Sequence, residues 1–597
     1  MTTYTAPTRD MEFVINELAG LQQVAGLPGC EEASSDLVSS VLEEAGKLGS
    51  EVLAPLNHAG DQQRARMEDG EVRTPDGWKE AYRTFIDSGW NGLPFSPDHG
   101  GQGLPWLLAT AVQEIWHASN MAFGLCPLLT QAAIEAIDRH ASKELQELYL
   151  EKLVSGEWTG TMTLTEPQAG SDLSAVRTRA VPEGDHYLIT GQKIFITYGE
   201  HDLTENIIHL VLARTPDAPE GVKGISLFVV PKFKVGANGE LLERNDVRCV
   251  SLEHKLGIHA SPTAVLAYGD KGGAVGFPVG EENRGLEYMF TMMNLARHAV
   301  GVEGVGIAER AYQQAREYAK ERKQGHAIGA DGNGRSPIID HPDVRRMLMT
   351  MKAHIEAMRA LVYVAASGMD HSFRNPDTNE KARHASTVDV LIPVVKGWSS
   401  ELGVEIASLG VQIHGGMGYI EETGAAQHLR DARITPIYEG TTGIQAADLV
   451  GRKLIRDHGE SVHAVLADMR ADAKAAENVS GDEVSTIRQA FEQAIDTLAQ
   501  ATDWILQANE QDPRLPAAAS AHYLRLFGTV AGGWQMTRAA HVAQRKIDAG
   551  DNESAFYRTK LNTALFYAQQ VLPQASAFLQ SMTRGSEVVM ALTTDEF

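Results

Sequence analysis

One glutamate in the C-terminal half of the chain has the surroundings that a general base needs. Glu439 lies in the segment LRDARITPIYEGTTGIQ, residues 429–445, between Tyr438 and a glycine and directly before two hydroxyls, Thr441 and Thr442. A carboxylate beside an aromatic ring and a backbone without a side chain is partly desolvated, which raises its pKa toward the working pH of a base. The same residues also fit a loop glutamate that caps a helix opened by Thr441 or Thr442. From this segment alone, the capping interpretation is favoured.

Two upstream segments carry residues suited to contacting a flat ring system. Residues 162–172 read MTLTEPQAGSD, and residues 191–197 read GQKIFIT. Strand alternation predicts Phe195 and Thr197 on the same face, as two contacts to one ring require. The phenyl ring can pack on such a system and the hydroxyl can form a hydrogen bond to it. An ordinary core phenylalanine and ordinary loop residues fit these segments as well.

Together and in this order, the three segments resemble the signatures of the acyl-CoA dehydrogenases, flavoenzymes that desaturate fatty acyl thioesters. The resemblance implies that FAD is the cofactor and that Glu439, the glutamate of IYEGT, takes the α proton while N5 of FAD receives the β hydrogen. A cofactor is needed because no side chain accepts hydride. The resemblance also implies that the backbone N–H of Glu439 and a ribityl hydroxyl of FAD bind the enolate charge.

The resemblance assigns further residues to the cofactor and to the substrate. Those implied for FAD are Met162, Leu164, Thr165, Ser171, Phe195, Thr197, Arg322, Gln412, Gly416, Thr441 and Thr442. Those implied for the acyl-CoA are Ser171, Asn294, Arg297, Tyr438 and Gly440. Arg322 corresponds to an arginine that reaches the FAD of a neighbouring subunit, so a homodimer or higher homo-oligomer is implied. No residue is assigned to a metal.

Several positions depart from the family pattern. Phe195 replaces the commoner tryptophan, Gly443 stands where many relatives have glutamine, and residues 324–340 form a glycine-rich insertion. These differences affect the adenine-side and inter-subunit assignments. Some relatives place their base on the helix beside the cleft arginine, but that neighbour is Ala296 here, so Glu439 has no rival.

Arg297 is a candidate functional residue even without the family resemblance. It lies on an apolar helical stripe that includes Met289, Met293 and Val300. An arginine on such a stripe is costly unless it is paired. It therefore either closes a structural ion pair or faces a ligand.

The composition limits the classes of function. The chain has 597 residues, 43% of them hydrophobic, which predicts three or four domains. Its net charge of −25 makes nucleic acid an improbable partner. Cys30, Cys126 and Cys249 are far apart, so neither a disulfide framework nor a zinc site is expected.

The N-terminal sequence MTTYTAPTRDMEF has no basic segment followed by an apolar core. No apolar run approaches the roughly 18 residues that span a bilayer. We therefore expect a soluble cytoplasmic protein without an integral membrane segment; peripheral membrane association is left open.

Hydrophobic periodicity predicts a multidomain α+β fold. We expect an N-terminal helical domain, a central β domain that is a barrel or sandwich, a C-terminal domain like a four-helix bundle that carries the base, and a helical extension. Their predicted bounds are residues 1–158, 159–285, 286–458 and 459–597. Unbroken apolar runs at 207–213, 225–231 and 264–268 indicate strands covered on both faces.

The extension resembles that of the larger bacterial family members, including the methylmercaptopropionyl-CoA dehydrogenase type. We expect packing or an oligomer interface as its role.

The favoured hypothesis is an FAD-dependent acyl-CoA dehydrogenase of fatty acid β-oxidation that forms a trans-2-enoyl-CoA and passes electrons to an electron-transfer flavoprotein. Medium- or long-chain fatty acyl-CoA and 3-methylthiopropanoyl-CoA both remain open as substrates. An acyl-CoA oxidase that uses O₂ and a non-catalytic acyl-CoA-binding protein are the alternatives.

Overall fold

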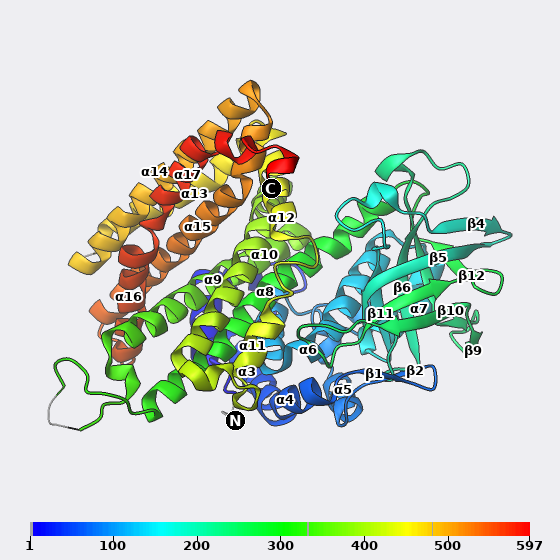
Figure 1. Cartoon of the computed structure of the whole chain (residues 1–597), viewed down its shortest axis with the longest axis horizontal. Helices are drawn as coiled ribbons and strands as arrows, with labels where there is room; N and C mark the ends of the chain where they lie inside the picture. The colour runs from blue at the N-terminus through cyan, green and yellow to red at the C-terminus, as the bar shows by residue number, and fades with distance from the viewer. Residues whose placement is uncertain (1–3, 331–333, 480) are drawn as a thin grey trace. The chain divides into compact units, whose positions relative to one another are not determined.

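The computed structural model describes residues 4–330, 334–479 and 481–597 (Figure 1). The chain divides into two compact units, each assembled from separate stretches of sequence. The helical unit comprises Met1–Glu44, Pro105–Glu114 and Val300–Phe597. The mixed unit comprises Ala45–Leu104 and Ile115–Ala299. The predicted α+β class is confirmed, with helices before and after a central β region; the four predicted domain boundaries stay predictions.

The mixed unit contains all the strands among the described residues. They are β1 (Arg66–Glu68), β2 (Glu71–Arg73), β3 (Trp158–Thr163), β4 (Arg179–Glu183), β5 (His186–Thr197), β6 (Asn206–Ala213), β7 (Ser226–Pro231), β8 (Phe233–Val235), β9 (Leu241–Arg244), β10 (Val247–Leu252), β11 (Thr263–Tyr268) and β12 (Ala274–Pro278). Its helices include α4 (Ala54–Gln63), α5 (Trp78–Asp87) and α7 (Lys143–Ser155). Parts of α6 (Trp106–His140) and α8 (Gly285–Glu321) also belong to it.

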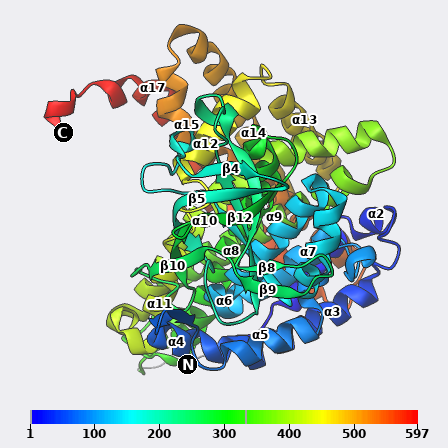
Figure 2. The same ribbon diagram turned by 90° about the vertical axis from the view of Figure 1, so that its right-hand side faces the viewer.

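One sheet contains eight of these strands in the order β10-β11-β5-β12-β7-β6-β3, with β4 paired to β5. β3 runs parallel to β6, and the other neighbours are antiparallel. Figure 2 shows the curvature of this sheet, which forms the half-barrel of the central region. The prediction of strands covered on both faces is confirmed, because every residue of β6, β7 and β11 is buried.

Helix α6 packs closely on β3 because a glycine removes the side chain between them. A Cβ on Gly160 would lie 2.5 Å from the Cβ of Ala133. The Gly160 N–H donates to Thr130 Oγ1 at 3.1 Å. This contact fixes the strand that leads directly into the first predicted cofactor segment.

One local prediction was wrong. A β-hairpin, β1 and β2, lies inside the region predicted to be helical, because Asp69 and Gly70 both have positive φ and form a tight turn. Among the described residues one helix, α6, is long and apolar enough to cross a membrane by length and composition. Its most apolar window is completely buried in the protein, as in a core helix.

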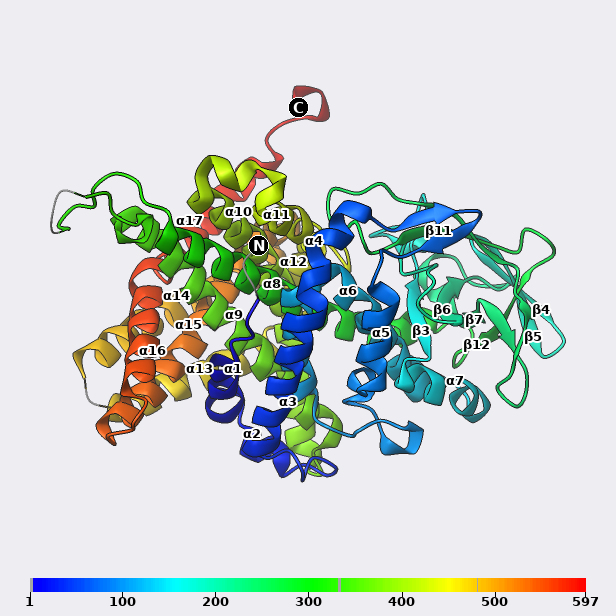
Figure 3. The same ribbon diagram turned by 90° about the horizontal axis from the view of Figure 1, so that it is seen from below.

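The helical unit contains the remaining α-helices. They are α1 (Thr8–Phe13), α2 (Leu21–Ala25), α3 (Ser35–Leu48, in part), α9 (Pro342–Arg374), α10 (Thr378–His414), α11 (Ala425–Ala432), α12 (Thr442–Val450), α13 (Glu460–Ala475), α14 (Asp482–Gln511), α15 (Arg514–Asp548), α16 (Ser554–Phe566) and α17 (Gln574–Gly585). α9 and α10 pack along their length, and α15 contacts both of them as well as α12. The predicted helical extension is confirmed, and α14, α15 and α16 lie side by side (Figures 1 and 3).

The extension docks on α10 through glycines. A Cβ on Gly528 of α15 would lie 2.2 Å from Cγ of Trp398. A Cβ on Gly397 would lie 2.5 Å from Leu524. Because α10 also carries a side chain that holds the predicted catalytic turn, the extension supports that turn through this helix.

Candidate functional site

The predicted base lies in the turn between α11 and α12 of the helical unit. Glu439 has a φ of 54° and Gly440 a φ of 85°, so two consecutive residues adopt left-handed backbone conformations. For a residue with a side chain this conformation costs about 1–3 kcal/mol, and it persists where surrounding contacts impose it. The side chain of Glu439 is partly buried. Strain of this kind is typical of functional positions.

Two completely buried side chains impose the conformation of this turn. Lys396 Nζ on α10 donates to the carbonyl oxygens of Thr435 at 2.8 Å and Gly440 at 2.7 Å. Gln445 Nε2 on α12 donates to the carbonyl oxygens of Glu439 and Gly440, both at 3.2 Å. These bonds fix the peptide groups on both sides of the base.

The two hydroxyls after the base serve the local structure. Thr441 is the N-cap of α12, where its Oγ1 accepts the Ile444 N–H at 3.2 Å. The Thr442 hydroxyl donates to Oε1 of Glu401 at 2.6 Å. The interpretation of Glu439 as the helix cap is therefore wrong. The cofactor contacts predicted for Thr441 and Thr442 stay predictions.

A second carboxyl group lies behind the turn. The Tyr438 hydroxyl donates to Oε2 of Glu303, a fully buried residue of α8. Burial raises the pKa of Glu303 to about 8; the Tyr438 hydrogen bond and the charge of Lys396 oppose this rise, and the charge of Glu439 adds to it. Burial and the neighbouring carboxyl groups of Glu303 and Glu439 also raise the pKa of Tyr438.

Sequence reasoning missed Glu303, Lys396 and Gln445. A signal existed for Glu303 and Lys396, because each is a charged residue within a run of small or apolar ones, AVGVEGVGIA and LIPVVKGW. Gln445 carries no such signal.

The second group of predicted residues lies on β3, in the segment that follows it, and on β5 of the mixed unit. On β5, Lys193 pairs with Leu266 of β11 and Ile196 pairs with Ala264. The chain advances three residues on β5 but only two on β11 between these pairs, so β5 contains a bulge. Phe195 lies in this bulge with a φ of 60° and 59% of its surface exposed.

The bulge interrupts the strand alternation on which the same-face prediction depends. Phe195 is nevertheless exposed and Thr197 partly exposed, while Ile196 between them is buried. Both predicted cofactor contacts thus lie outside the core. The Ile194 N–H donates to the Thr165 carbonyl at 2.9 Å, which places the end of the β3 segment beside the bulge.

The other predicted residues of this segment differ in exposure. Met162 and Thr165 are partly exposed, Leu164 is buried and Ser171 is exposed.

A buried ion pair holds the β3 segment on β5. Lys193 Nζ donates to Oε1 of Glu166 and to the Leu164 carbonyl, both at 2.9 Å. Both side chains are buried. Glu166 also accepts the N–H groups of Arg177 at 2.8 Å and Thr178 at 3.1 Å and the Thr178 hydroxyl at 2.6 Å. Sequence reasoning missed this pair, although Lys193 lies within GQKIFIT.

Asn294 and Arg297 lie on the part of α8 that belongs to the mixed unit. Asn294 is partly exposed and Arg297 is buried. Both roles considered for Arg297, ion pair and ligand contact, stay predictions.

Arg322, Gln412 and Gly416 are exposed on the helical unit. The Arg322 carbonyl accepts the Ile338 N–H at 2.7 Å, which anchors the glycine-rich insertion; residues 331–333 of that insertion lie outside the described residues. Exposure is compatible with the predicted adenine-side roles, which stay predictions.

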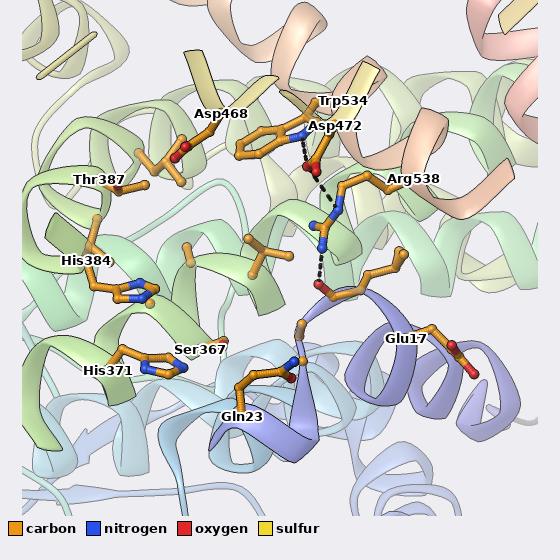
Figure 4. A pocket seen from close by; sticks show the side chains of 18 of the residues that line it. Glu17, Gln23, Ser367, His371, His384, Thr387, Asp468, Asp472, Trp534 and Arg538 are labelled. Carbon is orange, nitrogen blue, oxygen red and sulfur yellow. Dashed lines mark hydrogen bonds and ion pairs between the residues drawn. The ribbon is translucent and has the colours of Figure 1, made fainter. Parts of the chain in front are cut away.

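The helical unit also has a pocket of about 520 Å³ that is separate from the predicted site residues (Figure 4). Some of its polar groups bind one another: Trp534 Nε1 donates to Asp472 at 2.7 Å, and Arg538 donates to the Leu18 carbonyl at 2.7 Å. The rings of His371 and His384 stack with centroids 4.3 Å apart. None of the predicted site residues lines this pocket. Within the described part of the chain, no group of three or more His, Cys, Asp or Glu side chains could hold a metal.

Comparisons with known families give matches along most of the chain, from residue 41 to residue 593. The acyl-CoA dehydrogenase N-terminal, middle and C-terminal domains match residues 41–157, 161–270 and 283–455. A fourth family, described as acetyl-CoA dehydrogenase C-terminal like, matches residues 465–593.

Two curated proteins and one solved structure illustrate the likeness. The chain is 50% identical to 3-methylmercaptopropionyl-CoA dehydrogenase of Ruegeria pomeroyi, over 96% of this chain and 97% of that protein. It is 33% identical to the broad-specificity linear acyl-CoA dehydrogenase FadE5 of Mycobacterium tuberculosis, over 100% and 98%. The structure of Caenorhabditis elegans ACDH-11 in complex with C11-CoA has the same fold, with a TM-score of 0.76, 20% identity and coverage of 98% and 96%.

Proposed function

Because the chain belongs to the acyl-CoA dehydrogenase family, we propose that it dehydrogenates 3-methylthiopropanoyl-CoA with Glu439 as the catalytic base. The chain is an acyl-CoA dehydrogenase, an enzyme that uses FAD. The 50% identity with 3-methylmercaptopropionyl-CoA dehydrogenase over nearly the whole length supports the proposed substrate. Medium- and long-chain fatty acyl-CoA are the second candidates, supported by the 33% identity with a broad-specificity linear enzyme.

The residues of the mixed unit fit a flavin. The exposed ring of Phe195 on a bulge offers an aromatic face. Thr197 on the same strand and Thr165 in the segment after β3 are partly exposed. Met162, Leu164 and Ser171 would complete the flavin side. When bound, FAD supplies the acceptor for the β hydrogen and its electron pair.

Glu439 would take the α proton on a carboxylate oxygen, while the β hydrogen leaves with its electron pair and a double bond forms between the two carbons. The observation that carries this role is the strained turn, because Lys396 and Gln445 hold the carbonyls of Glu439 and Gly440 with three hydrogen bonds, and Lys396 also holds the Thr435 carbonyl before the base. A fixed backbone keeps the carboxylate aimed at one carbon, which lowers the entropy cost of the proton transfer. The backbone N–H of Glu439 would bind the negative charge that develops on the thioester oxygen.

The remaining assignments belong to the same proposal. Arg322, Gln412 and Gly416 would contact the adenine side of FAD, with Arg322 reaching the cofactor of a second subunit in a homodimer. Asn294 and Arg297 would lie along the thioester. An electron-transfer flavoprotein would accept the electrons, and the enzyme would work in the cytoplasm.

A substrate panel tests the proposal. The purified FAD-loaded protein is assayed with an artificial electron acceptor against 3-methylthiopropanoyl-, butanoyl-, octanoyl- and hexadecanoyl-CoA. The highest kcat/KM is expected for the methylthio thioester; a higher value for a fatty acyl-CoA would contradict the substrate assignment. Peroxide formation at the rate of dye-linked turnover would indicate an oxidase.

The base is tested in the same assay. Glu439→Gln should bind FAD normally and lose about 10²–10⁴-fold in kcat. The matched control is Glu147→Gln, a change of an exposed glutamate on α7, which should leave kcat unchanged.

A further inference from the structure

Helices α8 and α10 approach each other so closely that only glycine fits at their crossing. A Cβ on Gly301 would lie 2.4 Å from Val395 Cγ1, and one on Gly304 would lie 2.4 Å from the Ser399 carbonyl oxygen. Glu303 lies between these two glycines on α8. The crossing therefore places a carboxyl group in the interior, beside the element that carries Lys396.

The surroundings of Glu303 are unsuited to a negative charge. The side chain has 0% exposure, and only Oε2 has a hydrogen bond, from the Tyr438 hydroxyl. Within the described residues, Oε1 has no hydrogen-bond partner. Leaving an ionised carboxylate buried with so few partners is far more costly than burying the neutral acid. Lys396, the nearby cation, donates to two backbone carbonyls.

We propose that Glu303 is a positioning residue for the base: as a neutral carboxylic acid it holds the Tyr438 hydroxyl and thereby orients the adjoining residue, Glu439. The inference rests on the proposed role of Glu439. It adds that the Glu303 carboxyl group must stay protonated while the Glu439 carboxyl group is ionised. Like charges in one site favour this division, because ionising one carboxyl group makes the second harder to ionise.

Three groups act on the charge of Glu303. Tyr438 and Glu439 face it from the turn before α12, and Lys396 faces it from α10. The pKa of about 8 means that Glu303 is neutral at pH 7 and ionises as the pH rises through 8. Its negative charge would then oppose the charge that the reaction develops on the thioester. A fall of kcat/KM above about pH 8 is the expected signature.

Four variants of the FAD-loaded enzyme test the proposal. Tyr438→Phe removes the donor and keeps the ring, and Glu303→Leu removes the acceptor; each should lower kcat about tenfold, with KM within about twofold. The double variant should have a kcat no lower than that of the less active single variant, because both changes break the same contact. Glu303→Gln keeps a neutral acceptor for the Tyr438 hydroxyl. It should retain kcat at pH 7 and lose the fall of kcat/KM at alkaline pH.

The controls separate positioning from folding. FAD content and the thermal midpoint are measured for every variant, and Glu147→Gln is the surface control. Glu303→Gln with a kcat as low as that of Glu303→Leu would show that the charged form is needed. Wild-type kcat in Tyr438→Phe, or an unchanged alkaline fall in Glu303→Gln, would also overturn the proposal.

The parent assignment is tested by a different variant. If Glu439→Gln kept full turnover, the proposed base would be wrong, whatever Glu303 did. If Glu439→Gln were inactive while Tyr438→Phe and Glu303→Leu were fully active, only the positioning role would be wrong.

Discussion

Removing Lys193 should destabilise the mixed unit and loosen its hold on FAD. The buried Lys193–Glu166 pair links β5 to the segment after β3. Loss of one partner of such a pair costs about 3–5 kcal/mol because the other charge is left uncompensated. Glu166 keeps donors from Arg177 and Thr178. We therefore expect Lys193→Met to lower the free energy of unfolding by about 3 kcal/mol, the lower end of this range.

Thermal unfolding of the FAD-loaded enzyme measures this effect. For a unit of this size about 1 kcal/mol shifts the midpoint by about 2–4 °C, so Lys193→Met should unfold about 6–12 °C lower and release FAD earlier. The double variant Lys193→Met/Glu166→Gln removes both charges and should recover at least half of the loss. An unchanged midpoint for the single variant, or a double variant less stable than the single one, would contradict this role of the Lys193–Glu166 pair.

The same pair gives the sign of a pH effect. Burial acts to raise the pKa of Glu166, but Lys193 and the neighbouring donors outweigh it and hold the pKa at about 2, below the ordinary 4.5. The stabilisation is therefore fully present above pH 4.5 and is lost as the pH falls toward 2. FAD retention in acid should fall less steeply with pH in the double variant than in the wild type.

Three further variants follow from the structure. Phe195→Ala removes the exposed ring of the bulge and should weaken FAD binding about tenfold, measured by flavin fluorescence on dilution; unchanged affinity would contradict the flavin contact. Gln445→Leu removes two hydrogen bonds to the turn that carries the base and should lower kcat about tenfold at constant FAD content, whereas wild-type kcat would show that the turn needs no such support. Gly528→Val places atoms where Trp398 lies and should lower the thermal midpoint by the equivalent of about 3 kcal/mol or more, while Gly585→Val, which has open space, should not; equal midpoints would contradict the docking of the extension.

The parts of the fold that follow local periodicity were predictable. The apolar runs of β6, β7 and β11 form buried strands, and the helical stripe of α14 is buried as its spacing indicates. The hairpin at Asp69 and Gly70 was missed because two turn residues outweigh the helical character of the surrounding region.

Only part of the candidate site could be found in the sequence. Glu439 and Phe195 were found through contiguous motifs. Glu303 and Lys396 reach the turn from α8 and α10, so their contacts depend on a helix crossing that short-range patterns do not encode. The bulge at Phe195 is likewise a property of strand pairing.

The proposed reaction depends on the Glu439 carboxylate taking the α proton. Anaerobic rapid mixing of the FAD-loaded enzyme with 3-methylthiopropanoyl-CoA tests it in one turnover, because the yellow flavin absorbance bleaches as hydrogen is removed. We expect rapid bleaching in the wild type and bleaching about 10²–10⁴-fold slower in Glu439→Gln at equal FAD content. Bleaching of Glu439→Gln at the wild-type rate would contradict it.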